Sequence, residues 1–199
     1  ACMSTDTPGL AKTIERGVFR GEQGGPHINT IAALALAFKI AQTDHFKELQ
    51  GQIIKNAVAF AKQLQARGLR VPYEGTDTHI VLLDCKTITA GKGVYLSGDM
   101  AARILDAAGI VTNRNTIPGD RSAFSATGVR FGTAWLTQRG FKEKEHTQIA
   151  DIIADIFEAT TPYNMPGRRS PKRRAKVTFN ALENAKLAVK ALAEQAEDY

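Results

Sequence analysis

The chain has 199 residues, 43% of them hydrophobic, and a formal net charge of +6. This length suffices for one sizeable core, or for a core and the end of a second domain. No apolar run approaches the roughly 20 residues of a membrane helix, and the first residues resemble no signal peptide. The two cysteines, Cys2 and Cys85, form no disulfide framework. We therefore expect a cytoplasmic protein with no membrane partner.

The net charge is concentrated in one place. Six of the 26 Lys and Arg lie in residues 168–176, and elsewhere basic and acidic residues balance. A short basic run beside Gly167 and Pro171 is typical of a solvated linker. The run has no interleaved aromatic residue that could stack on bases. We therefore predict a linker and no nucleic-acid partner.

The first third of the sequence predicts helices. Apolar spacing favours one helix near residues 8–16 and another from Ile28 to Ile40. Asp44 can cap a third helix, for which Gly68 is a plausible end. The buried stripe of this third helix is predicted to be Phe46, Leu49, Ile53, Phe60 and Leu64.

The middle of the sequence alternates between strand and helix patterns. Strands are expected at 69–74 and 79–84, and the second, nearly continuous in apolar residues, suits a central strand. A helix near 98–108 follows, then a short strand at 110–112. Residues 113–121 form a polar loop.

The last part predicts one strand and two helices. A strand contains Arg130, and a helix follows whose apolar face comprises Ile149, Ile152, Ile153, Ile156 and Phe157. Pro162 and Pro166 stop that helix. Thr178 can cap a final helix that packs on the body or on a partner chain. This alternation favours an α/β domain with a mixed sheet.

Arg130 lies between Val129 and Phe131 in a strand predicted to be buried, on the face opposite these two neighbours. A buried guanidinium needs an anion, because an unpaired buried charge costs several kcal/mol. Either a structural carboxylate or the carboxylate of a substrate would serve. The residues alone leave both alternatives open.

A glycine-rich turn precedes the second helix. Gly21, Gly24 and Gly25 are followed by Pro26, which suits the first helical position. Free backbone N–H groups at such a turn can bind phosphate. The other reading is an ordinary tight turn.

The histidines and cysteines indicate no catalytic or metal centre. His27 begins a helix and His79 starts an apolar strand, so structural roles are favoured. His45 and His146 are expected to be exposed. No His, Cys and Asp spacing predicts a metal site.

Four blocks in one order resemble serine hydroxymethyltransferases. They are F-R-G-E-Q-G-G-P-H from Phe19, T-D-T-H-I-V-L-L-D from Thr76, N-R-N-T-I-P-G-D from Asn113, and G-V-R-F-G-T with L-T-Q-R-G-F-K-E from Gly128. The resemblance implies interconversion of serine and glycine with transfer of a one-carbon unit to tetrahydrofolate. Pyridoxal phosphate is the implied cofactor.

The resemblance also implies roles for individual residues. Arg130 would bind the amino-acid carboxylate, Arg139 would support the site, and Asn115 would contact the pterin of tetrahydrofolate. Gly24 and Gly25 would reach the phosphate of the other subunit's cofactor, which makes a homodimer part of the active site. The family's cofactor-lysine block, T-H-K-T-L-R-G-P-R-G-G, does not occur in these residues. We therefore expect the isolated chain to be inactive and assign no catalytic residue in it.

The implied fold is the C-terminal small α/β domain of a fold-type-I pyridoxal-phosphate enzyme. Residues 1–45 would be the tail of the large domain, 46–160 the small domain, and 161–199 a basic linker with a C-terminal helix. Two alternatives remain. One is another fold-type-I enzyme, such as a threonine aldolase or an aminotransferase. The other is a non-catalytic interaction module that retains the small-domain fold.

Overall fold

The computed structural model describes residues 7, 9–19, 21–167 and 172–196. Two compact units divide the chain, Ala1–Lys47 and Glu48–Tyr199. The assignment of residues 1–45 to the tail of a large domain stays a prediction. None of the helices in the described part of the chain has the length and apolarity that crossing a lipid bilayer requires.

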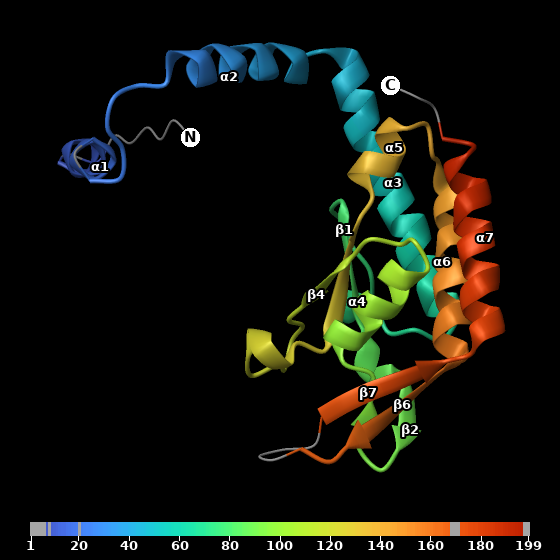
Figure 1. Ribbon diagram of the computed structural model, residues 1–199. Helices are drawn as coiled ribbons and strands as arrows, with labels where there is room; N and C mark the ends of the chain where they lie inside the picture. Colours follow the sequence, from blue (N-terminus) through green and yellow to red (C-terminus); the bar gives the residue numbers. More distant parts are fainter. Residues whose placement is uncertain (1–6, 8, 20, 168–171, 197–199) are drawn as a thin grey trace. The chain divides into compact units, whose positions relative to one another are not determined.

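The first unit contains helices α1 (Leu10–Val18) and α2 (Ile28–Ala41), as predicted (Figure 1). Helix α2 is apolar all round, a pattern normally found in helices that are buried on every side. Its large side chains are nevertheless exposed here: Ile28, Ile31, Leu34, Leu36, Phe38 and Ile40. The first unit therefore has an apolar surface that its own described residues do not cover.

Helix α3 (Asp44–Ala66) carries the predicted stripe. Ile53, Phe60 and Leu64 are buried, and Phe46 and Leu49 are half-buried. The predicted Asp44 cap is wrong. Asp44 is the first helical residue, and the Oγ1 of Thr43 accepts the Phe46 N–H at 3.3 Å. The helix is followed by a turn at Gly68, as predicted. Gly68 has a φ of 79°, which glycine adopts without strain because it has no Cβ.

The central sheet has the order β1-β5-β4, from β1 (Ile80–Asp84), β4 (Asn113–Asn115) and β5 (Gly128–Gly132). Strand β5 lies between β1 and β4 and runs antiparallel to both. The prediction of a mixed sheet is therefore wrong. The apolar strand β1 is confirmed, but it lies at the side of the sheet, and the Arg130 strand takes the centre.

The strand predicted at 69–74 is wrong. Arg70 makes one isolated bridge to Asp84, and the chain then enters a 3₁₀ helix, η1 (Pro72–Glu74). Pro72 has no N–H to donate to a ladder, and Tyr73 has a φ of 61°, which no strand permits. The apolar pattern around Leu69 and Val71 instead reflects burial in the core.

The strand predicted at 110–112 is displaced by three residues. Strand β4 comprises Asn113–Asn115, inside the segment expected to be a loop, and a short 3₁₀ helix, η3 (Ala123–Ser125), follows it. A ladder is formed by backbone groups, so a polar tripeptide can pair when a neighbouring strand is in place. The side-chain pattern could not reveal this pairing.

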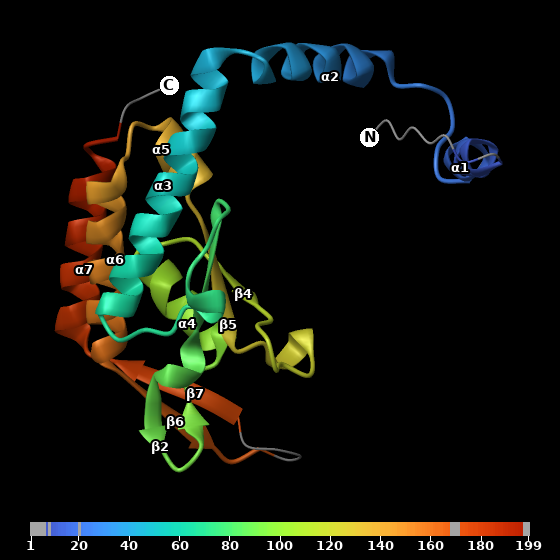
Figure 2. The same cartoon turned by 180° about the vertical axis from the view of Figure 1, so that it is seen from behind.

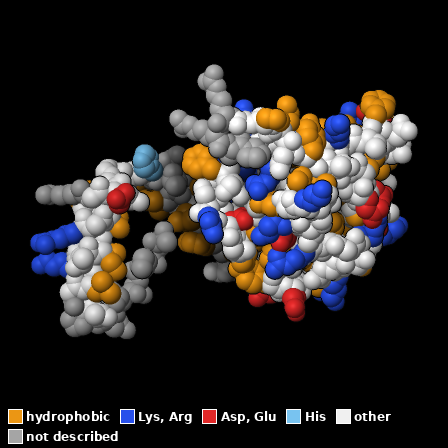
Figure 3. Space-filling model, turned by 90° about the horizontal axis from the view of Figure 1, so that it is seen from below, with side chains coloured by type: hydrophobic (Ala, Val, Ile, Leu, Met, Phe, Trp, Pro, Cys, Tyr) orange, Lys and Arg blue, Asp and Glu red, His pale blue; other side chains and the backbone are white. Residues whose placement is uncertain are grey.

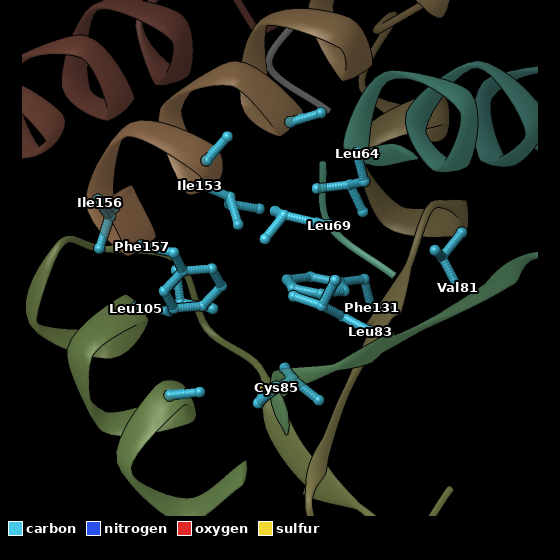
Figure 4. Packing of buried hydrophobic residues seen from close by; sticks show 14 of the residues in the cluster. Leu64, Leu69, Val81, Leu83, Cys85, Leu105, Phe131, Ile153, Ile156 and Phe157 are labelled. Carbon is cyan, nitrogen blue, oxygen red and sulfur yellow. The ribbon is translucent and has the colours of Figure 1, made fainter. Parts of the chain in front are cut away.

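The core lies on one face of the sheet. Helices α3, α4 (Gly98–Ala107) and α6 (Glu143–Glu158) supply its other walls, and α4 and α6 confirm two predicted helices. Figure 4 shows their apolar side chains meeting those of β1 and β5. The labelled residues are Leu64, Leu69, Val81, Leu83, Cys85, Leu105, Phe131, Ile153, Ile156 and Phe157.

Three short elements complete the second unit near this core. A small hairpin joins β2 (Thr89–Gly91) to β3 (Val94–Tyr95), and a 3₁₀ helix, η2 (Cys85–Thr87), follows β1. Helix α5 (Ala134–Gln138) follows β5 directly. The last helix, α7 (Phe179–Ala193), lies beside α6 in both views, so packing on the body is confirmed (Figures 1 and 2).

The predicted basic linker is wrong where the structure describes it. Helix α6 ends at Glu158, before Pro162, and a hairpin follows from β6 (Thr160–Met165) and β7 (Lys172–Val177). A proline is compatible with a two-stranded ribbon when its N–H side faces solvent. Residues 168–171 of the basic run lie outside the described residues.

A buried amide joins α3 to the segment around α5. The Nδ2 of Asn56 donates to Thr137 Oγ1 and to the Phe141 carbonyl, both at 2.8 Å, and its Oδ1 accepts from Gln52 Nε2 at 2.8 Å. Asn56 is fully buried. Removal of the amide would take a hydrogen-bond partner from the Thr137 hydroxyl, the Phe141 carbonyl and the Gln52 amide, so Asn56 matters more than its volume suggests.

We predict that Asn56→Ala lowers the free energy of unfolding by about 2–4 kcal/mol, since a cavity and unpaired polar groups arise together. Urea denaturation followed by circular dichroism measures the change. The exposed neighbour provides the control, and Lys55→Ala should stay within about 0.5 kcal/mol of the parent chain. Equal stabilities for the two variants would contradict the role assigned to Asn56.

His146 is buried, with 2% exposure, so the expectation that it is exposed is wrong. Its Nδ1 lies 2.9 Å from the Lys142 carbonyl, and its Nε2 has no partner among the described residues. A cavity of about 90 Å³ lies beside it, lined by apolar groups that include Phe60, Phe131 and Ile149. Burial lowers the pKa of His146, although the Lys142 carbonyl, Glu145 and Glu143 oppose the shift.

A lowered pKa in the folded state makes stability depend on pH in one direction. The contribution is complete above the unfolded pKa of about 6.5 and is lost as pH falls below it, because the unfolded chain then binds a proton more readily. We expect the stability of the chain to fall between pH 7 and pH 5 and His146→Gln to reduce that fall. Thermal unfolding at matched pH values measures it, and identical pH profiles would refute the assignment.

Candidate functional site

Arg130 lies at the centre of β5, between buried Val129 and Phe131, and its own side chain is exposed. The sheet is thus buried on one face and open on the other, so the expected burial of this guanidinium is wrong. Arg130 pairs in register with Leu82 on β1 and Asn113 on β4. Directly opposed residues of antiparallel strands share a face, so these three side chains lie on the open face.

No carboxylate of the described residues forms an ion pair with Arg130. The structural ion pair, one of the two alternatives raised by the sequence, therefore finds no partner among them. A guanidinium presents a planar fork of donors that matches a carboxylate in two parallel hydrogen bonds. The arrangement can bind an anion from outside the described chain.

Arg130 lines an open hollow of about 470 Å³, together with residues that include His79, Ile80, Thr112, Asn113 and Gly132. The Thr112 hydroxyl is buried and has no hydrogen-bond partner in the described part of the chain. Sequence reasoning missed Thr112, because a threonine next to an apolar pair indicates an ordinary strand. An unpaired hydroxyl beside an arginine suits a polar ligand.

The end of β5 is fixed by hydrogen bonds from Thr133. Its Oγ1 donates to the Ile53 carbonyl at 3.0 Å and lies 3.3 Å from the His79 carbonyl, which also accepts the Thr133 N–H at 3.1 Å. The backbone of His79 therefore has a structural role, while its side chain is exposed and lines the hollow. These bonds tie the Arg130 strand to α3 and β1.

Asn115 is half-buried at the end of β4, and its Nδ2 donates to the Thr116 carbonyl at 2.7 Å. It shares the open face with Arg130 but lines a second hollow, of about 290 Å³, together with Phe124. Phe124 is 90% exposed. Sequence reasoning missed this aromatic residue, because a single phenylalanine in a polar loop carries no periodic signal.

The loop between these two residues is held by Asp120. Its carboxylate accepts the Ile117 N–H at 3.1 Å, the Thr127 N–H at 2.8 Å and the Thr127 hydroxyl at 2.6 Å. Burial alone would raise the pKa of Asp120, but these hydrogen bonds outweigh it and lower the pKa. An ionised Asp120 thus connects the loop to the start of β5.

Arg139 does not share the hollow of Arg130. It follows the last residue of α5 and lines an apolar groove with Trp135, Leu136 and Val189, among others. Gly132 lines both spaces. The two predicted arginines therefore line different spaces, which share Gly132 as a lining residue.

Gly24 and Gly25 lie in the first unit, between α1 and α2. No hydrogen bond within the described residues uses their N–H groups, and a Cβ built on either would meet nothing within 4 Å. Pro26 was predicted to be the first helical residue, and this is wrong. Helix α2 begins two residues later, at Ile28, and His27 is its N-cap residue. Free N–H groups before a helix are suited to phosphate oxygens.

A metal centre finds no support in the described residues, where no group of three His, Cys, Asp or Glu side chains is arranged to hold an ion. Cys85 is fully buried and its thiol pKa is raised by that burial, which keeps it protonated.

Comparison with known proteins identifies the family. A family model described as serine hydroxymethyltransferase matches residues 4–153. "Probable serine hydroxymethyltransferase, cytosolic" from Schizosaccharomyces pombe is 44% identical over 159 residues, which are 79% of this chain and 33% of that protein. The chain thus spans about a third of the length of this relative. The resemblance expected from four sequence blocks is confirmed, and the chain belongs to the serine hydroxymethyltransferase family.

Proposed function

We propose that the protein containing this chain converts serine and tetrahydrofolate reversibly into glycine and 5,10-methylenetetrahydrofolate, with pyridoxal phosphate as cofactor. Family membership supports the reaction class. The observation that carries the proposal is the Arg130 guanidinium, which is exposed on the open sheet face and pairs with no carboxylate of the described chain. The relative's name places that protein in the cytosol, and we propose the same location here.

Arg130 binds the carboxylate of the amino acid in this proposal. Two parallel hydrogen bonds fix the rotation of the carboxylate and, through it, the orientation of the three other bonds at the α-carbon. Bound pyridoxal phosphate supplies an electron sink for the bond that breaks. The contribution of Arg130 is positioning, because a substrate turned away from the productive orientation loses most of its rate. Arg139 supports this site from the neighbouring groove.

The glycine turn suits the cofactor's phosphate. The N–H groups of Gly24 and Gly25 are not used within the described residues, and no Cβ restricts the approach of an oxygen atom. By the family resemblance, this phosphate belongs to the cofactor of a second subunit, so we propose a homodimer. The exposed apolar surface of α2 supports this, since surface of that kind is normally covered in an assembly.

Asn115 contacts the pterin ring of the folate substrate in this proposal. An amide can donate and accept at once, as a ring with both kinds of group requires. Phe124 adds an exposed flat surface in the same hollow, on which a heteroaromatic ring can stack. The open face thus has an anion-binding end and an amide–aromatic end.

The second unit, Glu48–Tyr199, is proposed to be the small C-terminal domain of a fold-type-I enzyme, and the first unit the tail of its large domain. This division includes the β6–β7 hairpin and α7 in the small domain. The cofactor lysine would come from the family's T-H-K-T block, which the 199 residues do not contain. On this basis the isolated chain is inactive.

Arg130→Lys in the whole enzyme should lower kcat/KM for serine about 100-fold, because an ammonium is a point charge and cannot fix the rotation of a carboxylate. The thermal midpoint should change little, since the side chain is exposed. Steady-state kinetics with serine and tetrahydrofolate measures the effect. Arg103→Lys, on the exposed side of α4, is the control, and an unaltered kcat/KM in Arg130→Lys would exclude the carboxylate clamp.

Asn115→Ala should raise KM for tetrahydrofolate about tenfold and leave folate-independent cleavage of a β-hydroxy amino acid unchanged, because the proposed contact of the amide is to the pterin and not to the amino acid. The two assays together separate the proposed function from a threonine aldolase or an aminotransferase, which use no folate. Asn180→Ala on α7 serves as the matched control. Loss of both activities in parallel would count against the pterin contact, and the absence of any activity in the whole protein would favour the interaction module.

A further inference from the structure

The described part of the basic run lies in β7 (Lys172–Val177), which forms one side of the β6–β7 hairpin. In β7 the residues alternate between exposed and half-buried, with Lys172, Arg174 and Lys176 exposed. These three pair with Met165, Tyr163 and Thr161 of β6. Directly opposed residues of antiparallel strands share a face. One face of the hairpin, the basic ribbon face, therefore carries Lys172, Arg174, Lys176, Thr161, Tyr163 and Met165.

Aromatic rings lie among these cations. The Nζ of Lys176 is 5.5 Å from the centre of the Tyr163 ring. On the other face of β7, the Arg173 guanidinium stacks 4.1 Å from the centre of the Tyr95 ring, which belongs to the β2–β3 hairpin. The basic run contains no aromatic residue, but β6 places Tyr163 beside its cations. Cation–π contacts of this kind hold the ribbon in shape.

No carboxylate of the described residues forms an ion pair with Lys172, Arg174 or Lys176. Figure 3, which views the molecule from below Figure 1, shows Lys and Arg side chains gathered over the body of the second unit. The cations of the basic ribbon face therefore lack compensation within the described chain. A concentration of uncompensated charge favours an anionic partner.

We propose that the basic ribbon face binds single-stranded nucleic acid. Alternate residues of a strand are about 7 Å apart, which is close to the distance between successive phosphates of an extended single strand. Three cations in this register can follow a phosphate backbone, and Tyr163 at their centre offers a ring for one base. A polar tyrosine with one methionine offers little apolar surface for insertion into a lipid layer.

The two premises of the sequence-based prediction against a nucleic-acid partner do not hold in the fold. The run is a strand in residues 172–177, so its charges are held in a fixed register. Tyr163 stands opposite Arg174, so an aromatic residue is interleaved with the charges in space. None of these residues lines the hollows that contain Arg130 and Asn115. The basic ribbon face is thus a separate site.

The test measures fluorescence anisotropy of a labelled oligouridylate of about 12 nucleotides, within the usual span of single-strand-binding surfaces. The full chain is titrated at several salt concentrations. Replacement of Lys172, Arg174 and Lys176 by Ser should reduce affinity at least tenfold and lower the steepness of log K against log salt by about 2, as expected for three lost phosphate contacts. Lys176→Ser alone should lower it by about 0.7.

Two further variants separate this site from general charge attraction. Lys62, Lys144 and Lys190 are exposed on α3, α6 and α7, and their joint replacement by Ser removes the same charge elsewhere; it should retain most of the affinity. Tyr163→Leu should weaken the oligonucleotide about tenfold, through the lost stacking, and leave inorganic polyphosphate binding unchanged. Thermal unfolding checks that each variant is folded. If the triple variant does not fold, the salt dependence of Lys176→Ser tests the proposal instead.

Three outcomes would overturn the proposal. They are equal losses in the two triple variants, an oligonucleotide affinity that does not depend on Tyr163, and binding to phosphatidylserine vesicles without binding to the oligonucleotide. The first would indicate general charge attraction, the second a site for any polyanion, and the third a membrane surface.

Discussion

The two-residue period of β5 is the constraint on which the second unit depends. Val129 and Phe131 point into the core with α3, α4 and α6, so Arg130 between them must point the other way. A slip of one residue would place the guanidinium in the core and two apolar side chains in solvent. The burial that stabilises the sheet therefore also fixes the face on which the proposed carboxylate clamp lies.

Polar contacts then restrict how far that strand can move. Thr133 joins the end of β5 to the backbones of Ile53 and His79, and Asn56 joins α3 to the segment that follows α5. Each of these buried groups is hydrogen-bonded, so displacement of one element would leave partners unpaired. A rigid support of this kind is what a positioning residue requires, because the orientation of a bound carboxylate is only as accurate as its arginine.

The sequence was informative wherever one side-chain period covered a whole element. Helix α6 and strand β5 were predictable because burial on one face gives the apolar residues a regular period. Helix α2 was predictable from its apolar residues at helical spacing. Strand β4 and the β6–β7 hairpin were not, since they are formed by backbone pairing with distant segments, and their residues are polar, basic or proline. The buried His146 was missed because its charged neighbours, Lys142 to Glu145, indicate solvent. The roles of Arg130, Arg139 and Asn115 were assigned from family motifs, and the division of these three residues between two hollows and a groove is a property of the fold alone.

Whether a basic run is a linker or a paired strand also determines how its charge acts. A run of cations in a linker is averaged over many conformations, and its attraction for an anion is diffuse. In β7, the pairing with β6 holds alternate cations on one face at a regular spacing, with a tyrosine ring among them. Composition alone cannot separate these two cases, because they contain the same residues. The ribbon and the open sheet face share no lining residue, so a ligand on one leaves the hydrogen-bonding groups of the other available.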